Sequence, residues 1–315
     1  MSLWLIGAGP HAREYAKVLM DLQHPFEVIG RGAASAKEFQ TVMGKSVRTG
    51  GLEVELVLHG APDQAIVSAS FDQLSSVAAT LIRSGTRHIL LEKPAALTLN
   101  EIRSLNKLAN DCDAQVWIAY NRRFYASTIK ARELILEDGG ASSCAFEFTE
   151  WSNMIEPMPL PEVTKRAWMI ANSSHVADLA FHLCGAPADW QAWQSGAMTW
   201  HPAAARFCGA GVTDRGILFS YHADWDAPGR WGLEVLTCKR RFIFRPMESL
   251  QVTHLSSTKV EPVVLDDALD VNFKPGLYLQ TQAFLEGKSK ILCTLAEQER
   301  MISMYAKMAG YTKNA

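Results

Sequence analysis

The stretch "LWLIGAGPHAREYAKVL", residues 3–19, joins an apolar run to a segment of different spacing through a short, glycine-rich loop. The apolar run at residues 3–6 has the length of a strand, and the apolar positions that follow recur at helical spacing. Between them, Gly7, Gly9 and Ala12 follow the pattern G-x-G-x-x-A. The sequence therefore predicts a strand, a tight loop and a helix at the start of the chain.

Each small residue of this loop has a physical role in binding a dinucleotide. Gly7 permits the tight turn, Gly9 lets the backbone approach a pyrophosphate, and Ala12 lets the helix pack closely on the strand. The helix N-terminus directs N–H donors at the anion. The pattern predicts a dinucleotide site, and the alternative is a tight turn with no ligand.

The end of the second expected strand, in "EVIGRGAAS", bears on the choice of cofactor. An NAD-preferring site usually has a carboxylate there, which bonds the ribose 2′-hydroxyl. This chain has Gly30 and Arg31 instead, with Ser35 close by. A guanidinium suits a 2′-phosphate, so we expect NADP to be preferred over NAD. The alternative is that Arg31 is a surface residue in a loop.

The order of the remaining segments predicts the fold class. As far as residue 119, short apolar strands alternate with amphipathic helices, which indicates an N-terminal Rossmann domain with a doubly wound parallel sheet. From residue 120, one helix is followed by long β-type stretches and then by helices again, which indicates an α+β domain with a large, mostly antiparallel open sheet. We therefore expect an α/β protein with domains 1–119 and 120–315, whose C-terminal helices can pack back on the first domain.

Composition excludes several classes of protein. The chain has 315 residues, 48% of them hydrophobic, and a net charge of −2, so nothing suggests nucleic acid as a partner. Its six cysteines lack C-x-x-C spacing, which favours reduced thiols over a zinc site or a disulfide framework. The first strand starts too early to leave room for a signal peptide, and no apolar stretch is long enough to span a bilayer. We expect a cytoplasmic protein.

A second informative stretch is "ILLEKPAALT", residues 89–98, where an apolar strand runs into Glu92, Lys93 and Pro94. Ligands of doubly wound sheets bind beyond the carboxyl ends of the strands, and this is such an end. The Lys93–Pro94 bond is a candidate for the cis form, which is essentially confined to X-Pro bonds. Thr98 is expected to start the next helix. The alternative is a solvated strand end with an incidental ion pair.

Three later motifs, "AYNRRF" (119–124), "RAWM" (166–169) and "NSSHVADLAFHLCG" (172–185), complete a pattern that spans the whole chain in order. With the Gly-rich loop and Glu-Lys-Pro, the chain resembles the glucose–fructose oxidoreductase/inositol dehydrogenase/MocA (Gfo/Idh/MocA) family of NAD(P)-dependent sugar oxidoreductases. The resemblance implies a Rossmann domain followed by a mostly antiparallel sheet domain, with the active site in the cleft between them.

The same resemblance implies the roles of individual residues. It makes Lys93 the catalytic lysine and His175 the acid/base, with no metal. The expected cofactor-binding residues are Gly7, Gly9, Pro10, His11, Ala12, Arg31, Ser70, Glu92, Pro94, Asn121 and Arg122. The expected substrate-binding residues are Tyr120, Arg123, Trp168, Asn172 and Ser173. The chemistry agrees, because removing a hydride from an alcohol needs a proton acceptor and a donor that holds the developing oxyanion.

His175 also allows other interpretations. Asp178 and His182 follow on roughly one helical face, so the three side chains could form a metal site, or His175 could be a satisfied core histidine. Many members of the family carry an aspartate four residues before the histidine, where this chain has Ala171. The expected catalytic set is therefore a pair, Lys93 and His175, rather than a triad.

The sequence therefore predicts an enzyme. It is expected to be an NAD(P)-dependent oxidoreductase that interconverts a secondary hydroxyl and a ketone on a sugar, nucleotide sugar or cyclitol. One alternative is a cofactor-binding sensor without turnover, and another is a related imine or pyrrole reductase. The expected partner is a small sugar-like molecule rather than nucleic acid or membrane. An exposed antiparallel sheet is a natural oligomer surface, so we expect a homo-oligomer that forms through the C-terminal sheet.

Overall fold

The computed structural model describes residues 1–287 and 290–311, and its chain divides into two compact units. Unit 1 consists of Met1–Asn121 and Leu269–Glu299. Unit 2 consists of Arg122–Ala268 and the residues from Arg300 onward. The boundary near the C-terminus falls within one helix, α12 (Leu295–Ala309).

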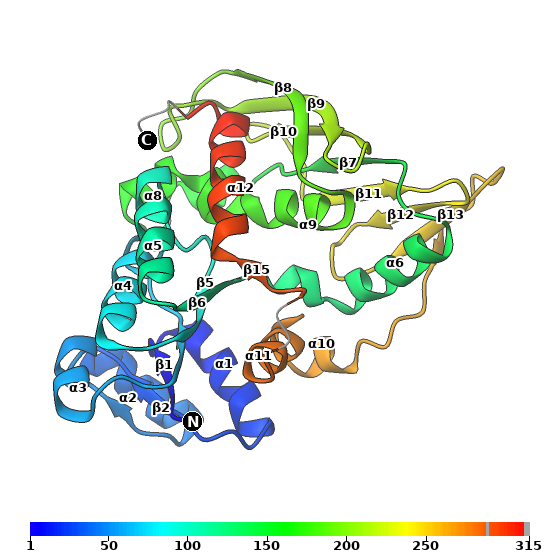
Figure 1. Ribbon diagram of the computed structural model, residues 1–315. Coiled ribbons are helices and arrows are strands. Elements are labelled where there is room, and N and C mark those ends of the chain that lie inside the picture. Colours follow the sequence, from blue (N-terminus) through cyan, green and yellow to red (C-terminus); the bar gives the residue numbers. More distant parts are fainter. Residues whose placement is uncertain (288–289, 312–315) are drawn as a thin grey trace. The chain divides into compact units, whose positions relative to one another are not determined.

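Unit 1 begins with alternating strands and helices, drawn in blue to cyan in Figure 1. Its strands are β1 (Leu3–Ile6), β2 (Glu27–Ile29), β3 (Val47–Arg48), β4 (Gln64–Val67), β5 (His88–Glu92), β6 (Gln115–Ala119) and β15 (Cys293–Thr294). Its helices are α1 (Pro10–Asp21), α2 (Ala33–Met43), α3 (Leu52–His59), a 3-10 turn η1 (Phe71–Gln73), α4 (Leu74–Ser84), α5 (Leu99–Asp111), α10 (Ala268–Asn272, from the last residue of unit 2), α11 (Leu277–Leu285) and the first turns of α12.

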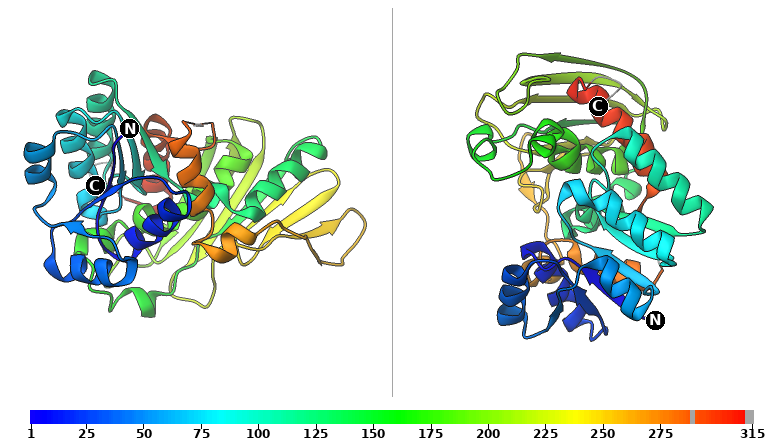
Figure 2. Two further views of the ribbon diagram at one scale, coloured as in Figure 1. Left: turned by 90° about the horizontal axis from the view of Figure 1, so that it is seen from below. Right: turned by 90° about the vertical axis from the view of Figure 1, so that its left-hand side faces the viewer.

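The strands of unit 1 form one sheet in the order β15-β6-β5-β4-β1-β2-β3. All neighbouring pairs are parallel except β15 with β6. Right-handed crossovers on either side of β1 send successive helices to opposite faces of such a sheet. Accordingly, α1 contacts α2 and α11, while α4 contacts α5 (Figures 1 and 2). The structure thus confirms the doubly wound Rossmann sheet.

Local sequence explains how these helices form. The predicted apolar face of α1 is buried completely, with Ala12, Tyr15, Val18 and Leu19 all at 0% exposure. Thr98 caps α5 in a reciprocal capping box, in which its hydroxyl accepts from the backbone N–H of Glu101 and that side chain accepts from the N–H of Thr98. Both features follow the sequence predictions for these segments.

Unit 2 contains a second sheet and the helices that cover it, drawn from green to yellow in Figure 1. Its strands are β7 (Ser143–Glu147), β8 (Pro187–Ser195), β9 (Arg206–Thr213), β10 (Leu218–Asp224), β11 (Gly232–Leu236), β12 (Arg240–Phe244), β13 (Gln251–His254) and β14 (Glu261–Pro262). Its helical segments are η2 (Asn121–Phe124, starting at the last residue before the boundary), α6 (Ala126–Glu137), α7 (Ser152–Ile155), α8 (Glu162–Arg166), a π-helical turn η3 (Met169–Ser173), α9 (Ser174–Cys184) and the rest of α12.

The sheet of unit 2 has the order β14-β13-β12-β11-β7-β10-β9-β8 and is antiparallel except between β7 and β10. Helix α9 covers one face, where Phe181 makes edge contacts with Phe146 of β7 and Phe219 of β10. Along β10, buried and exposed residues alternate, so that its other side chains, such as Leu218 at 63% exposure, stay accessible. The structure confirms a large, mostly antiparallel sheet, and it adds strands β7, β8 and β9, which the sequence patterns do not predict.

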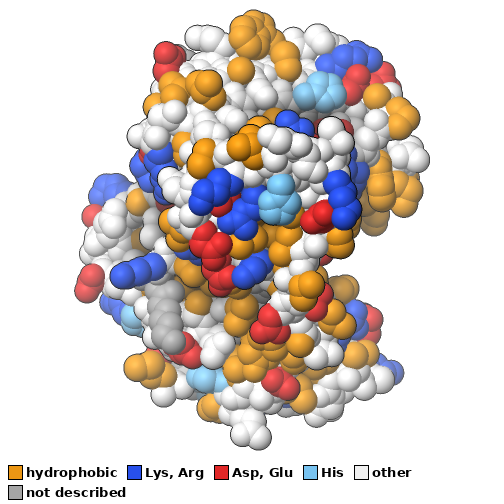
Figure 3. Space-filling model, turned by 90° about the vertical axis from the view of Figure 1, so that its right-hand side faces the viewer, with side chains coloured by type: hydrophobic (Ala, Val, Ile, Leu, Met, Phe, Trp, Pro, Cys, Tyr) orange, Lys and Arg blue, Asp and Glu red, His pale blue; other side chains and the backbone are white. Residues whose placement is uncertain are grey.

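Charged side chains of both signs are mixed on the face drawn in Figure 3. In unit 2, many are paired, as Arg240 is with Asp138 and Arg245 with Glu147. In the described part of the chain, every helix is too short or too polar to cross a bilayer.

One buried polar network connects distant segments of unit 1. The carboxylate of Glu92, at the end of β5, is 7% exposed and accepts from the phenol of Tyr15 in α1 at 2.7 Å. His11, in the first turn of α1, contacts the same carboxylate oxygen at 2.6 Å. Burial disfavours the charged carboxylate, but the interactions with His11 and Tyr15 outweigh it and lower the pKa of Glu92. Burial next to this carboxylate raises the pKa of Tyr15.

The Glu92 network predicts a pH-dependent contribution to stability. A carboxylate whose pKa is lowered by folding stabilises the protein above its unfolded pKa, near 4.5, and loses that contribution as the pH falls through the folded pKa. Glu92→Gln should therefore lower the free energy of unfolding by about 1–3 kcal/mol at pH 7 and by less below pH ~4. Denaturant unfolding across this pH range measures the difference. Glu27→Gln, at an exposed position of β2, is the control and should change the free energy of unfolding little. A loss of unfolding free energy in Glu92→Gln that is equal at every pH would contradict the role of the Glu92 charge.

Candidate functional site

A cavity of about 560 Å³ opens at the carboxyl ends of β1, β2 and β4 in unit 1. Its walls come from the loop after β1, the loop after β2 and the segment after β4. This is the crevice in which doubly wound sheets bind their ligands, at the strand where the chain order reverses. The volume is within the range of small-molecule and cofactor sites.

The Gly-rich loop forms one wall of this cavity with the geometry that a dinucleotide needs. Gly7 has φ +120, and a Cβ there would lie 2.2 Å from the backbone oxygen of Ser68, so only glycine fits. A Cβ on Gly9 would meet nothing within 4 Å, which leaves open space beside the backbone. Pro10 begins α1, and no side chain of the described residues caps this helix end, so its N–H groups remain available to an anion. These features fit a pyrophosphate.

Arg31 and Ser70 line the same cavity, as the sequence analysis expects for cofactor-binding residues. Asp72 follows on η1, and its pKa is lowered chiefly by a hydrogen bond from Gln73, with a smaller contribution from the charge of Arg31. Glu53, in the first turn of α3, also lines the cavity. The lining of the cavity thus carries the guanidinium of Arg31 together with one carboxylate, that of Glu53.

His11 lies between the loop and the end of β5. Lys274 Nζ donates to its Nδ1 at 3.0 Å, which leaves the Nε2–H to donate to Glu92. The next residue, Ala12, is fully buried and brings α1 close to the sheet. His11 and Glu92, both expected to bind cofactor, are thus joined directly, and this pair connects the Gly-rich loop to the Glu-Lys-Pro segment.

The segment after β5 holds Lys93 in a defined position. Lys93 is 7% exposed, and its ammonium lies 4.8 Å from the ring centroid of Phe71 on η1. The Lys93–Pro94 peptide bond is cis, as predicted. The carbonyl of Pro94 accepts from Gln298 Nε2 at 2.9 Å, and the following Ala95 has a left-handed φ of 71, which is uncommon for a residue with a side chain. Such strained backbone is often found at functional sites.

The end of β6 is fixed by the C-terminal part of unit 1. Tyr120 is 1% exposed, and its hydroxyl accepts from Gln298 Nε2 at 3.1 Å. Asn121 donates through its side chain to the carbonyl of Pro275 at 2.9 Å. In one orientation of its amide, Gln280 also accepts from the backbone N–H groups of both residues. Tyr120 and Asn121 are therefore anchored within unit 1, and their contacts to substrate and cofactor stay predictions.

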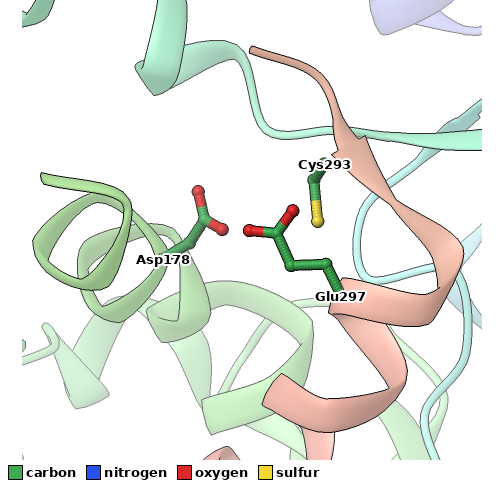
Figure 4. A group of neighbouring side chains, drawn as sticks. All are labelled: Asp178, Cys293 and Glu297. Carbon is green, nitrogen blue, oxygen red and sulfur yellow. The ribbon is translucent and has the colours of Figure 1, made fainter. Parts of the chain in front are cut away.

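The two arginines that follow belong to unit 2 and have different surroundings. Arg122 lies 4.7 Å above the ring of Trp231, and burial lowers the pKa of its guanidinium. Arg123 is 3% exposed and pairs in a two-pronged manner with Asp178 of α9, at 2.9 and 2.5 Å. Figure 4 shows the Asp178 carboxylate; Cys293 and Glu297, drawn with it, belong to unit 1. Asp178 is thus an ion-pair partner of Arg123 within unit 2.

The remaining expected site residues surround the start of α9 in unit 2. His175 is the second residue of this helix, is 7% exposed, and lies 6.1 Å from the ring centroid of Trp231. Trp168 is 5% exposed and packs edge-on against Trp200. Asn172 and Ser173 are at the end of the π-helical turn that directly precedes α9. His175 and Lys93 lie in different units, so their pairing stays a prediction.

Asn172 and Ser173 both donate to Glu150, which the sequence analysis does not single out. Ser173 Oγ and Asn172 Nδ2 lie 2.6 and 3.0 Å from the same carboxylate oxygen. Arg230 Nη1 donates to the other oxygen at 3.2 Å. Tyr15, Gln280 and Gln298 are likewise absent from the expected set, although they hold the segments around Lys93. No local pattern identifies these residues, because their partners are far away in sequence.

Comparison with known proteins supports the nucleotide-binding interpretation of unit 1. Residues 1–120 match the model of the oxidoreductase family with an NAD-binding Rossmann fold, GFO_IDH_MocA. No curated protein matches the sequence. Solved structures share the fold at low sequence identity. A UDP-N-acetylglucosamine 3-dehydrogenase from Acidithiobacillus ferrooxidans is 17% identical with a TM-score of 0.77, covering 100% of this chain and 98% of that one.

Two further solved structures resemble the chain over nearly its whole length. A levoglucosan dehydrogenase in complex with NADH and L-sorbose is 16% identical, has a TM-score of 0.81, and covers 100% of this chain and 97% of its own. An oxidoreductase from Agrobacterium radiobacter in complex with NAD+, L-tartaric acid and magnesium is 14% identical, with a TM-score of 0.78 and the same coverage. The match therefore assigns residues 1–120 to the NAD-binding Rossmann fold of the Gfo/Idh/MocA oxidoreductase family, and the solved structures show that the rest of the chain shares their fold.

Proposed function

We propose that the protein is an NADP-preferring oxidoreductase that interconverts a secondary hydroxyl and a ketone on a sugar-like molecule. The observation that carries this proposal is the arrangement of unit 1. The cavity beside the Gly-rich loop opens at the carboxyl edge of the sheet, and Lys93 follows the last residue of a strand in the same sheet. The His11–Glu92 pair connects the two segments.

The proposed chemistry divides between the cofactor and this chain's own side chains. The nicotinamide accepts or supplies the hydride when it is bound. Lys93, whose ammonium is nearly excluded from water, stabilises the oxyanion that develops at the reacting oxygen. His175 takes up the hydroxyl proton as general base, because an imidazole titrates near neutral pH.

The substrate class is inferred from the fold relatives and the aromatic side chains near His175. Two of the similar structures are dehydrogenases named for a sugar nucleotide and an anhydrosugar. In unit 2, Trp231 lies next to His175, and Trp151 is 52% exposed. An exposed aromatic side chain such as Trp151 suits the apolar face of a sugar ring. Assembly through the exposed face of the unit 2 sheet and a cytoplasmic location remain part of the proposal.

Two observations favour alternatives that the experiments below distinguish. Glu53 lines the cofactor cavity, and its carboxylate could accept from a ribose 2′-hydroxyl, which would favour NAD. Ala171 stands where many family members have an aspartate, which would suit a sensor that binds cofactor without turnover. The imine or pyrrole reductase differs only in its substrate, so a substrate screen separates it from a sugar dehydrogenase.

The NADP preference predicts the effect of removing the guanidinium at position 31. Arg31→Ala should weaken NADPH binding about 10- to 100-fold and NADH binding less than about threefold, because a charge-assisted contact to the 2′-phosphate is lost. Fluorescence titration of both reduced cofactors measures the two changes. Arg83→Ala, at an exposed position of α4, is the matched control and should change neither. Equal weakening of both cofactors by Arg31→Ala would contradict the preference.

The catalytic role of Lys93 predicts a loss of turnover without a loss of cofactor. Lys93→Ala should reduce kcat at least about 100-fold, because the donor to the oxyanion is missing, while the Kd for NADPH changes less than about threefold. Steady-state assays on the best substrate of a sugar and nucleotide-sugar screen, with the same titrations, test both parts. Lys107→Ala, at an exposed lysine of α5, should retain full activity. A Lys93→Ala protein that turns over normally would refute the assignment.

A further inference from the structure

The position four residues before His175, from which a carboxylate would polarise the imidazole, is occupied by Ala171. Ala171 is 0% exposed and apolar, so it supplies neither a charge nor a hydrogen bond from its side chain. The turn that contains it, Met169–Ser173, is π-helical, a geometry that occurs frequently at functional sites. A carboxylate that acts on this turn can also come from another segment of the chain.

Glu150 is such a group, and it lies in the same unit. It follows β7 by three residues, is 2% exposed, and directs its carboxylate at the π-helical turn. Ser173 Oγ donates to one carboxylate oxygen at 2.6 Å and Asn172 Nδ2 donates to the same oxygen at 3.0 Å. These donors precede His175 by two and three residues, which is less than one helical turn.

A second series of contacts leads from the same carboxylate to the imidazole. Arg230 Nη1 donates to the other oxygen of Glu150 at 3.2 Å. The guanidinium of Arg230 lies 4.5 Å from the ring centroid of Trp231, and that indole lies 6.1 Å from the ring of His175. Glu150 therefore reaches the surroundings of His175 both through the backbone turn and through the Arg230–Trp231 stack.

We propose that Glu150 is the positioning residue for His175 and supplies the negative charge that Ala171 lacks. It fixes the turn before α9 through Asn172 and Ser173, and its charge favours the protonated imidazole. This inference rests on the proposed acid/base role of His175, but the contacts that carry it do not involve the cofactor or unit 1. Asn172 and Ser173 are then part of the support for His175.

Opposing effects act on the charged form of the Glu150 carboxylate, because it is both buried and paired with hydrogen-bond donors. Burial raises the pKa of Glu150, although Ser173, Arg230 and Asn172 all stabilise its charged form. Arg122 also stacks on the ring of Trp231, and Glu248 is a charged neighbour of Arg122. On α9 itself, Asp178, three residues after His175, is paired with Arg123. A buried carboxylate with a raised pKa costs stability when it is ionised, so a purely structural role would not favour retaining it.

Histidine titration by NMR tests the proposal without a substrate. The full-length protein is labelled at histidine Cε1, and the His175 resonance is assigned by its loss in His175→Asn. In Glu150→Gln, the titration midpoint of this resonance should fall by about half a pH unit or more, because a nearby negative charge is removed. Glu147→Gln is the matched control, since Glu147 is a carboxylate of β7 paired with Arg245, and it should shift the midpoint by less than about 0.2 units.

An unchanged His175 midpoint in a folded Glu150→Gln protein would overturn the proposal. If that variant does not fold, Ser173→Ala removes one hydrogen bond to the carboxylate and should still move the His175 resonance, and no movement there would overturn it equally. Kinetics then separate this claim from the proposed function. If a substrate is turned over, Glu150→Gln should lower kcat with little change in KM and should shift the pH profile of kcat. If the His175 resonance shifts but the protein turns over no substrate, the proposed function is refuted and the role of Glu150 is not.

Discussion

The paired contacts of His11 and Tyr15 with the buried carboxylate of Glu92 are the interaction on which unit 1 depends. A charged carboxylate inside a protein is costly unless it is fully hydrogen-bonded, so this group constrains every segment that contacts it. It ties the first turn of α1, which directly follows the Gly-rich loop that lines the cavity, to the end of β5, from which Lys93 follows. The geometry of the Gly-rich loop and the position of the lysine are therefore set together.

The segments from the C-terminal part of the chain complete this arrangement. Gln298, in the first turns of α12, donates to the carbonyl of Pro94 and to the hydroxyl of Tyr120. Lys274 donates to His11 from the segment before α11. Each contact holds a polar group near the carboxyl edge of the sheet in place. The Rossmann sheet in this chain thus requires about thirty residues from beyond unit 2, Leu269–Glu299, to hold its functional edge.

Much of the fold could be predicted because its signals are local. The spacing of Gly7, Gly9 and Ala12, the apolar face of α1, and the cap at Thr98 all act over one or two helical turns. The β7–β10 pairing and strand β8 could not be predicted in this way. Parallel neighbours far apart in sequence leave no periodic signal. In β8 only Pro187 and Trp190 are buried, three positions apart, which obscures the alternation of a strand.

Residues of the candidate site likewise differ in whether local sequence could predict them. Lys93 and His175 stand out because their motifs follow one another in a recognisable order along the sequence. Arg31, which lines the cavity, stands out because it follows the second strand, where a carboxylate is usual. Glu150 has no such signal, because a single glutamate after a strand is common and its donors lie more than twenty residues away. Only the folded chain brings a carboxylate to the turn where Ala171 has none.

The most direct test of the account is hydrogen–deuterium exchange of the full-length protein with and without saturating NADPH. Bound cofactor should slow amide exchange in residues 7–13, which comprise the Gly-rich loop and the first turn of α1. It should also slow exchange in residues 89–97, because the Glu92 network connects the two segments. Unchanged exchange in both segments would contradict the cofactor site, and protection of the loop alone would contradict the coupling through Glu92.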